Sequence, residues 1–149
     1  METEAESVGY CKYYAPYDRI RDNKPELTCT KDADKYTVNS SIGNGLLDNP
    51  VGLITADEMV MAGAPYGSAN TEFYMYNTNK FYTSSPYYYC SYQDGARVWN
   101  FGNTMKDGVL YGDLVDCSYY ARPVINLDSN IRMYGSGTMS DPYRLTKEL

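Results

Sequence analysis

The sequence contains no histidine among its 149 residues. Mechanisms that depend on an imidazole, such as serine–histidine and cysteine–histidine catalysis or imidazole zinc sites, are therefore excluded. Positive charge is also scarce, since 13 basic residues stand against 19 acidic ones and the net charge is −6. A nucleic-acid backbone or an anionic membrane surface would be repelled by such a chain, so we expect neither as a partner.

Long apolar runs are missing too. None approaches the roughly 20 residues that a membrane-spanning helix needs, so we expect no membrane insertion. The acidic start METEAES lacks the basic and then apolar order of a signal peptide, and if the protein is exported this chain is a mature or trimmed form. Its length fits one domain, because a single hydrophobic core commonly serves about 100 to 200 residues.

Phenylalanine and tryptophan are few, with 3 and 1 residues, whereas there are 18 tyrosines. A core gains little from so many hydroxyl groups, each of which needs a hydrogen-bonding partner when it is buried. Tyrosine together with Asn, Ser, Asp and Gly is typical of antibody-like binding surfaces. A β-rich domain that uses tyrosine in its strands is the alternative, and composition alone does not separate the two.

Helix signals are confined to two short segments. Thr55 and Glu58 have the spacing of a capping box and Gly63 can end the following turn, which predicts a helix over 55–62. A second helix is predicted near 17–23, between two prolines.

The remaining sequence is typical of short strands and turns. Apolar or alternating runs bounded by turn residues predict strands at 51–54, 73–76, 80–83, 96–101, 109–111, 122–127, 131–134 and 143–145. We find no internal repeat. The sequence therefore predicts one compact α+β domain with short antiparallel strands, one or two short helices and much irregular loop.

The four cysteines do not form a CxxC pair, which disfavours zinc binding and thioredoxin-like chemistry. Their even number and wide spacing favour disulfides made in an oxidising compartment. A bridge between Cys11 and Cys29 would close an N-terminal loop that has little apolar content to order it. A bridge between Cys90 and Cys117 would join two tyrosine-rich loops, and two free thiols are the alternative.

Two pairs of acidic residues lie close together in the sequence, Asp32 with Asp34 and Asp113 with Asp116. Such pairs can share a proton or bind calcium through oxygen ligands. Neither pair has the spacing of an EF-hand loop, and acidic residues in turns are usually solvated. We therefore predict no catalytic residue, no metal site and no cofactor.

Two arginines, Arg97 and Arg122, lie within otherwise hydrophobic predicted strands. An unpaired charge there would be costly, so we expect both to tie loops to the sheet. A site for an anionic group of a ligand is the alternative. Trp99 alternates with Arg97 and Phe101, and we expect it in the core.

Several blocks of the chain, in their order, resemble a known family. They are 50–58 (PVGLITADE) with 62–63, then 82–86 (YTSSP), 96–99 (ARVW), 120–127 (YARPVINL), 135–138 (GSGT) and 141–143 (DPY). The blocks resemble C-type-lectin-like domains of the formylglycine-generating-enzyme type. Such domains occur in bacterial and phage surface proteins and in the variable proteins of diversity-generating retroelements.

The resemblance implies a C-type-lectin-like fold for a single domain over 1–149. Residues 50–149 match the framework and its binding loops, whereas 1–49 are loop-rich and fit more loosely. An oxidase of the same superfamily uses a pair of active-site cysteines, and this chain has no close cysteine pair in its C-terminal region. The resemblance therefore implies the scaffold without catalysis.

In retroelement proteins, mutagenesis directed at adenines moves varied codons toward Asn, Tyr, Asp, Ser, Thr, Gly and Cys. Those residues fill the segments between the framework blocks here, at 87–94, 111–113 and 116–120. The resemblance thus implies a variable binding surface. On such a surface, Cys90 and Cys117 would be products of the mutagenesis and not a selected disulfide. We expect ten residues to contact the ligand: Tyr88, Tyr89, Tyr92, Asn100, Asn103, Tyr111, Asp113, Asp116, Tyr119 and Tyr120.

The expected ligand is a protein, or a glycan, on another cell or virion, because rings scattered over several loops give a broad face. The expected location is extracellular, on a cell or virion surface. A pilus or cell-wall subunit whose tyrosines mediate self-assembly is the alternative. A divergent oxidase or hydrolase is a third hypothesis.

Overall fold

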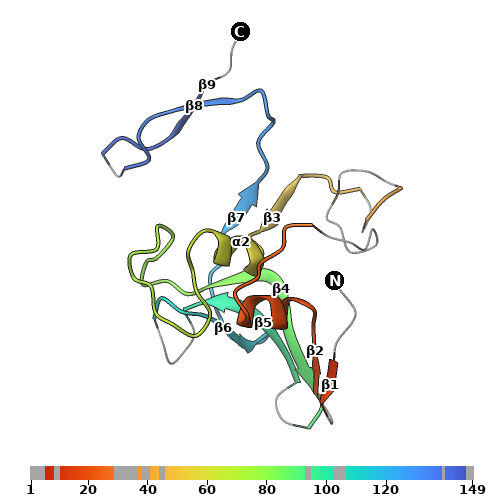
Figure 1. Ribbon diagram of the computed structural model, residues 1–149. Helices are drawn as coiled ribbons and strands as arrows, with labels where there is room; N and C mark the ends of the chain where they lie inside the picture. The colour runs from red at the N-terminus through yellow and green to blue at the C-terminus, as the bar shows by residue number, and fades with distance from the viewer. Residues whose placement is uncertain are drawn as a thin grey trace.

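A computed structural model describes residues 6–8, 11–28, 37, 41–43, 46–92, 95–102, 107–138 and 140–146. In this part the chain is mostly antiparallel sheet with two short helices, which agrees with the predicted small α+β fold (Figure 1). The elements are β1 (Glu6–Val8), β2 (Cys11–Tyr13), α1 (Pro16–Arg21), β3 (Val51–Leu53), α2 (Ala56–Met61), β4 (Phe81–Cys90), β5 (Gly95–Phe101), β6 (Leu110–Leu114), β7 (Pro123–Ile125), β8 (Arg132–Tyr134) and β9 (Arg144–Thr146).

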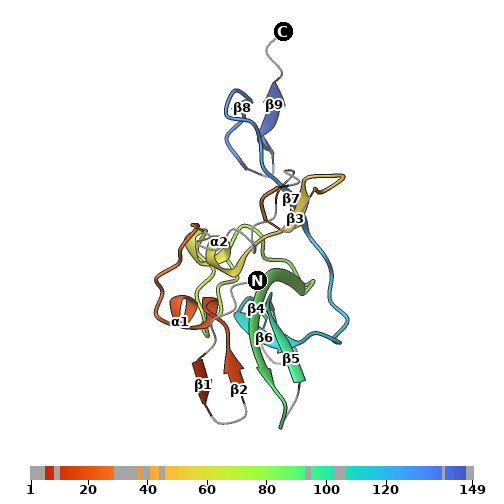
Figure 2. The ribbon, with the colours of Figure 1, turned by 90° about the vertical axis from the view of Figure 1, so that its right-hand side faces the viewer.

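The main sheet has five strands in the order β1-β2-β4-β5-β6, and each neighbouring pair is antiparallel. Its longest strand, β4, bends as it crosses the sheet (Figure 2). Two irregularities in the β4–β5 register accompany this bend, since an extra residue in one strand increases local twist and bending.

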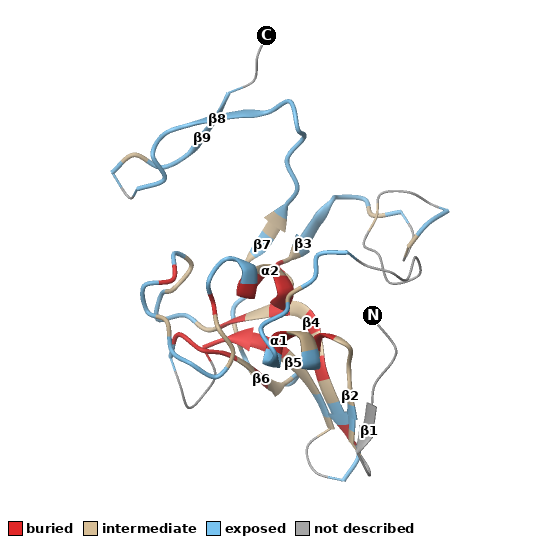
Figure 3. Ribbon diagram, in the orientation of Figure 1, coloured by how far each residue is buried: buried red, intermediate tan, exposed pale blue. Residues whose placement is uncertain are grey.

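Both helices pack against one face of this sheet, which we call the inner face. The core between them is formed by large side chains with almost no exposure: Trp99, Phe81, Phe101, Ile20 and Met59. Figure 3 shows this buried zone running through α2, β4 and β5. The predicted core position of Trp99 is confirmed, and each such side chain contributes roughly 1.5–3 kcal/mol through burial.

The helix α2 begins with the predicted capping box. Thr55 Oγ1 accepts a hydrogen bond from the backbone N–H of Glu58 at 3.1 Å, and Glu58 Oε2 accepts one from the backbone N–H of Thr55 at 2.8 Å. Asp57, one residue before, is buried and accepts two hydrogen bonds from Arg19 at 3.1 and 3.0 Å and one from the backbone of Glu26. This carboxylate therefore joins α2 to α1.

The predicted strand at 73–76 is wrong, because this segment forms turns. Phe73 is buried with its ring 5.2 Å from that of Phe101, and its carbonyl accepts the N–H of Tyr76 at 2.7 Å. A single aromatic anchor holds the loop on the core, so the alternation of apolar and polar residues here does not report a strand. The other predicted strands overlap observed ones.

Two smaller ribbons lie beyond the main sheet. β3 pairs with β7, and β8 pairs with β9 in a hairpin. The β8–β9 hairpin stands away from the body of the molecule, and all six of its strand residues are exposed (Figure 3).

The disulfide joins Cys11 to Cys90, two residues that face each other across β2 and β4. The expected pairs Cys11–Cys29 and Cys90–Cys117 are therefore wrong, and Cys117 is a free thiol. Cys29 lies outside the described residues. Cys11 and Cys90 meet because β2 pairs with the end of β4. The spacing of the cysteines along the sequence does not reveal this long-range pairing.

Neither helix in the described part of the chain is long and apolar enough to cross a membrane.

Candidate ligand-binding surface

The three consecutive tyrosines of β4 do not simply alternate between the faces of the sheet. From Pro86 to Tyr89 the strand advances three residues while its partner β5 advances two, which is a β-bulge. The bulge turns Tyr87 and Tyr88 to the inner face together, with ring centroids 5.0 Å apart. Tyr89 faces outward, because it pairs with Ala96 on the side of β5 opposite Trp99.

The inner-face tyrosines belong to an aromatic stack. The buried ring of Tyr87 lies 4.5 Å from Trp99 and 5.3 Å from Tyr17, and this burial raises the pKa of its hydroxyl. The half-buried ring of Tyr88 lies 5.3 Å from Tyr13, with the Arg97 guanidinium 5.4 Å from its centroid. Tyr88 was expected to contact ligand, and the structure gives it a place in the packing of the sheet.

Gly112 in β6 makes room for this stack. A methyl group on its Cα would overlap the ring of Tyr87. The neighbouring Tyr111, another expected ligand contact, is half-buried and stacks on Tyr66 with ring centroids 5.9 Å apart. The glycine at 112 is therefore explained by close packing, independently of any codon bias.

Two exposed tyrosines lie at the end of β4 that the disulfide closes. Tyr89 is 44% exposed, and Tyr92 in the turn that follows is 77% exposed. Val115 donates its backbone N–H to the carbonyl of Ala96 at 3.1 Å, which brings the exposed Asp116 to the same end of the sheet. We call Tyr89, Tyr92, Ala96, Val115 and Asp116 the outer patch.

Asp113 organises the turn that follows β6. It accepts hydrogen bonds from the hydroxyl of Tyr119 at 2.6 Å, from the backbone of Leu114 at 2.9 Å and from the thiol of Cys117 at 3.7 Å. Tyr82 donates its hydroxyl to the carbonyls of Leu114 and Cys117. These groups hold the turn in shape, so Asp113 and Tyr119 support the surface from within.

Electrostatics fit this supporting role. Burial, and then the hydrogen bond to Asp113, raise the pKa of Tyr119, which therefore keeps its proton. Burial, and then the negative charge of Asp113, also raise the pKa of the Cys117 thiol. A thiol with a raised pKa is a poor nucleophile at neutral pH.

Asn100 was expected on the surface, and this expectation is wrong because its side chain is fully buried. It pairs with Tyr82 across β4 and β5, and the ring of Tyr119 lies 5.1 Å from that of Tyr82. The segment after β6 thus crosses the outer face of the sheet and reaches the start of β4, where the exposed Tyr120 forms a bridge with Phe81. Asn103 lies outside the described residues.

Of the two arginines, Arg122 holds a loop as expected, whereas Arg97 contacts the ring of Tyr88 in the neighbouring strand. Arg122 donates a hydrogen bond to the carbonyl of Met75 and lies 4.2 Å from the ring centroid of Phe81, and burial lowers its pKa. It ties the loop that precedes β4 to the segment that leads into β7.

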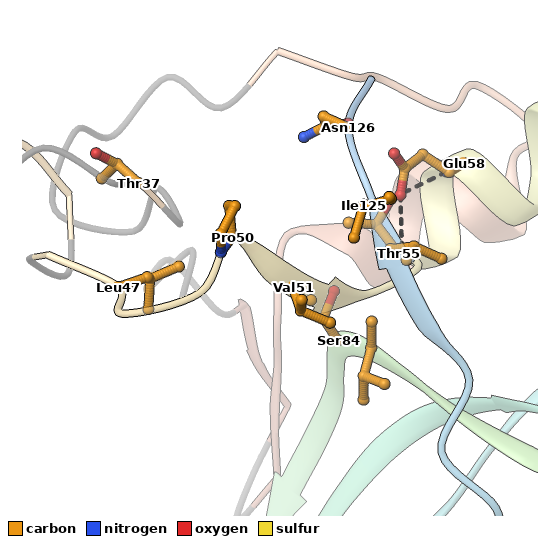
Figure 4. A pocket seen from close by; sticks show the side chains of 12 residues that line it. Thr37, Leu47, Pro50, Val51, Thr55, Glu58, Ser84, Ile125 and Asn126 are labelled. Atoms are coloured by element: carbon orange, nitrogen blue, oxygen red, sulfur yellow. Dashed lines mark hydrogen bonds between the residues drawn. The ribbon is translucent and has the colours of Figure 1, made fainter. Parts of the chain in front are cut away.

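A cavity of about 470 Å³ lies beside β3 and β7, and none of the ten expected ligand contacts lines it (Figure 4). Sequence reasoning missed it, because the pairing of β3 with β7 creates it. Its walls are mainly apolar and come from Thr37, Leu47, Pro50, Val51, Gly52, Leu53, Thr55, Glu58, Ser84, Val124, Ile125 and Asn126. We call this hollow the β3–β7 groove.

Comparison with known proteins gave no relative: no protein-family model, no curated protein and no solved structure matches the chain.

Proposed function

We propose that this chain is a C-type-lectin-like ligand-binding module without enzymatic activity, displayed on the surface of a cell or virion. Within that class we assign it to the variable proteins of diversity-generating retroelements. The observation that supports the proposal most is the outer patch, where the exposed rings of Tyr89 and Tyr92 flank a buried, disulfide-bonded Cys90.

Rigid support is what makes such rings effective in recognition. Tyr89 lies between Tyr88, which is packed in the inner stack, and Cys90, which is bonded to β2. A ring that is already ordered loses little entropy on binding, so its contact area converts more fully into affinity. Asp116 supplies a directional hydrogen-bond acceptor at the same end of the sheet.

The shape and charge of this surface favour a protein ligand. The patch lies across strand ends and a turn, away from the β3–β7 groove, and broad faces of this kind suit protein partners better than small molecules. The net charge of −6 favours a ligand surface that is neutral or basic. A glycan that stacks on the two rings is the alternative ligand.

The disulfide supports the proposed location. Disulfides persist in oxidising compartments such as the cell exterior, and Cys11–Cys90 joins two paired strands of the main sheet.

The structure narrows the residues that should vary. Tyr89, Tyr92, Asp116 and Tyr120 are exposed, whereas the other expected contacts among the described residues serve the packing. Sequencing of sibling genes from the same locus tests the retroelement assignment. We expect differences at these four exposed positions, constancy at the buried Trp99, and a near-copy of the segment with adenines at the differing sites. Siblings that vary mainly at buried positions, or not at all, would contradict it.

Binding can be tested without knowing the ligand. We expect the labelled chain to bind some strains in a panel of intact bacteria, measured by flow cytometry, and a printed glycan array to separate glycan from protein ligands. Tyr89→Ser/Tyr92→Ser should weaken cell binding about a hundredfold, as expected for two aromatic anchors. The matched control is Tyr74→Ser, which removes an equally exposed ring from a distant loop. Unchanged binding by the double variant would refute the role of the outer patch.

A structural pilus or cell-wall subunit is the second candidate. The observation that favours it is the exposed β8–β9 hairpin, whose apolar side chains would suit self-assembly.

A further inference from the structure

The β8–β9 hairpin has one apolar face and one polar face. Its register pairs Met133 with Leu145 and Tyr134 with Arg144. Paired residues share a face of a ribbon and neighbours along a strand alternate, so these two pairs lie on opposite faces. The side chains of the polar face contact each other, since the Arg144 guanidinium lies 5.9 Å from the ring centroid of Tyr134.

The apolar face is open to solvent. Met133 is 58% exposed and Leu145 is 53% exposed, and Ile131 and Tyr143 extend the same alternation. The hairpin stands apart from the buried zone in the views of Figures 1, 2 and 3. A two-stranded ribbon alone is only marginally stable in water, so this face gains most of its stability by packing on another surface.

The β3–β7 groove is a complementary surface within the same chain. Val51 and Ile125 face each other across β3 and β7, and both are exposed at the groove, with Leu47 and Pro50 beyond them (Figure 4).

The β8–β9 hairpin lies away from the β3–β7 groove of its own chain. Directly after β7, the backbone N–H of Asn130 donates to the Asp128 carboxylate at 2.8 Å, and the N–H of Ile131 donates to the Asp128 carbonyl at 3.0 Å. This turn directs the hairpin outward, whereas β7 itself forms one wall of the groove (Figure 1). The hairpin that fits the groove is therefore that of another copy.

We propose that two copies of this chain exchange their hairpins, so that the apolar face of each β8–β9 hairpin occupies the β3–β7 groove of the other. Such an exchange is reciprocal and closes as a twofold dimer. Four apolar side chains per hairpin, each about half exposed, and the groove walls that cover them give roughly 1,400 Å² of buried surface in all, within the range of specific dimers.

Sedimentation equilibrium of the full chain over micromolar to millimolar concentrations tests the exchange. We expect the wild type to dimerise, and Met133→Glu/Leu145→Glu on the apolar face to weaken dimerisation about a hundredfold or more. Val51→Glu in the groove should have a similar effect. The matched control is Tyr134→Ser, which removes an exposed ring from the opposite face of the hairpin and should leave the dimer intact.

Mixing the variants distinguishes exchange from simpler contacts. The hairpin variant keeps an intact groove and the Val51→Glu variant keeps an intact hairpin, so the mixture should form a mixed dimer through one restored contact. Native mass spectrometry with one variant isotopically labelled detects it. Circular dichroism spectra that match the spectrum of the wild type show that the substitutions leave the fold intact.

A monomeric wild type, or a hairpin variant that dimerises as the wild type does, would overturn the proposal. Absence of the mixed dimer would also overturn it, because the two hairpins would then contact each other and not the grooves. The outer patch takes no part in these contacts. A monomeric wild type would therefore leave the proposed ligand binding standing, and loss of ligand binding would leave the exchange standing.

Discussion

The disulfide between Cys11 and Cys90 joins two residues that are 79 positions apart in the sequence. Closing a loop of this length lowers the entropy of the unfolded chain by an amount worth about 4 to 5 kcal/mol at 25 °C. Cys11→Ala/Cys90→Ala should lower the free energy of unfolding by this order. For a chain of this size the melting temperature should then fall by roughly 10 to 15 °C.

Differential scanning calorimetry measures this change, with Cys117→Ser as the control. Cys117 is a free, half-buried thiol whose hydrogen bond to Asp113 is long, so its replacement should shift the melting temperature by only a few degrees. Comparable melting of the double variant and the wild type would refute the reasoning.

Peptide mapping identifies the bridge directly. Trypsin separates the four cysteines into the fragments 1–12, 22–31, 81–97 and 107–132. Under non-reducing conditions, fragments 1–12 and 81–97 should be recovered linked to each other. Recovery of 1–12 linked to 22–31 would show that Cys11 pairs with Cys29 and would overturn the β2–β4 register on which the outer patch depends.

Two further predictions concern the tyrosines that the fold uses. Gly112→Ala places a methyl group against the buried ring of Tyr87 and should destabilise the protein by about 1–3 kcal/mol in urea unfolding. Gly52→Ala, in an open position of β3, should be neutral or slightly stabilising, and equal effects of the two would contradict the packing. Because Tyr87 and Tyr119 have raised pKa values, their contribution to the free energy of unfolding should be constant below about pH 9. Above about pH 10 it should fall by up to about 1.4 kcal/mol per pH unit for each of them, and Tyr119→Phe should reduce that slope.

Local features of the fold could be predicted from the sequence. The capping box of Thr55 and Glu58 depends on residues three apart, and the alternation of 96–101 depends on neighbours within one strand. Both signals involve residues that are close together in the sequence, so they can be recognised without knowledge of the tertiary structure. The loop at 73–76 shows the limit, because one buried ring there outweighs the local pattern.

The candidate site depends on contacts between residues that are far apart in the sequence. The pairing of Cys11 with Cys90 requires the β2–β4 register, and the burial of Asn100 requires the segment after β6 to cross the sheet. The bulge in β4 decides which of Tyr88 and Tyr89 faces outward. Since a shift of one residue moves side chains to the other face, sequence alternation alone could not sort exposed from packed tyrosines.

The tyrosine excess therefore has two physical origins in this chain. Tyr87 and Tyr119 are used by the fold, through burial of a ring beside Trp99 and through a hydroxyl bonded to Asp113, whereas Tyr89 and Tyr92 are exposed. Mutation of the second group would cost little stability, but each change in the first would remove buried area or one hydrogen bond of the Asp113 carboxylate. The proposed binding module can thus use tyrosine for both tasks only if variation is confined to the outer patch and its surroundings. The pattern among sibling genes therefore tests the fold and the proposed function together.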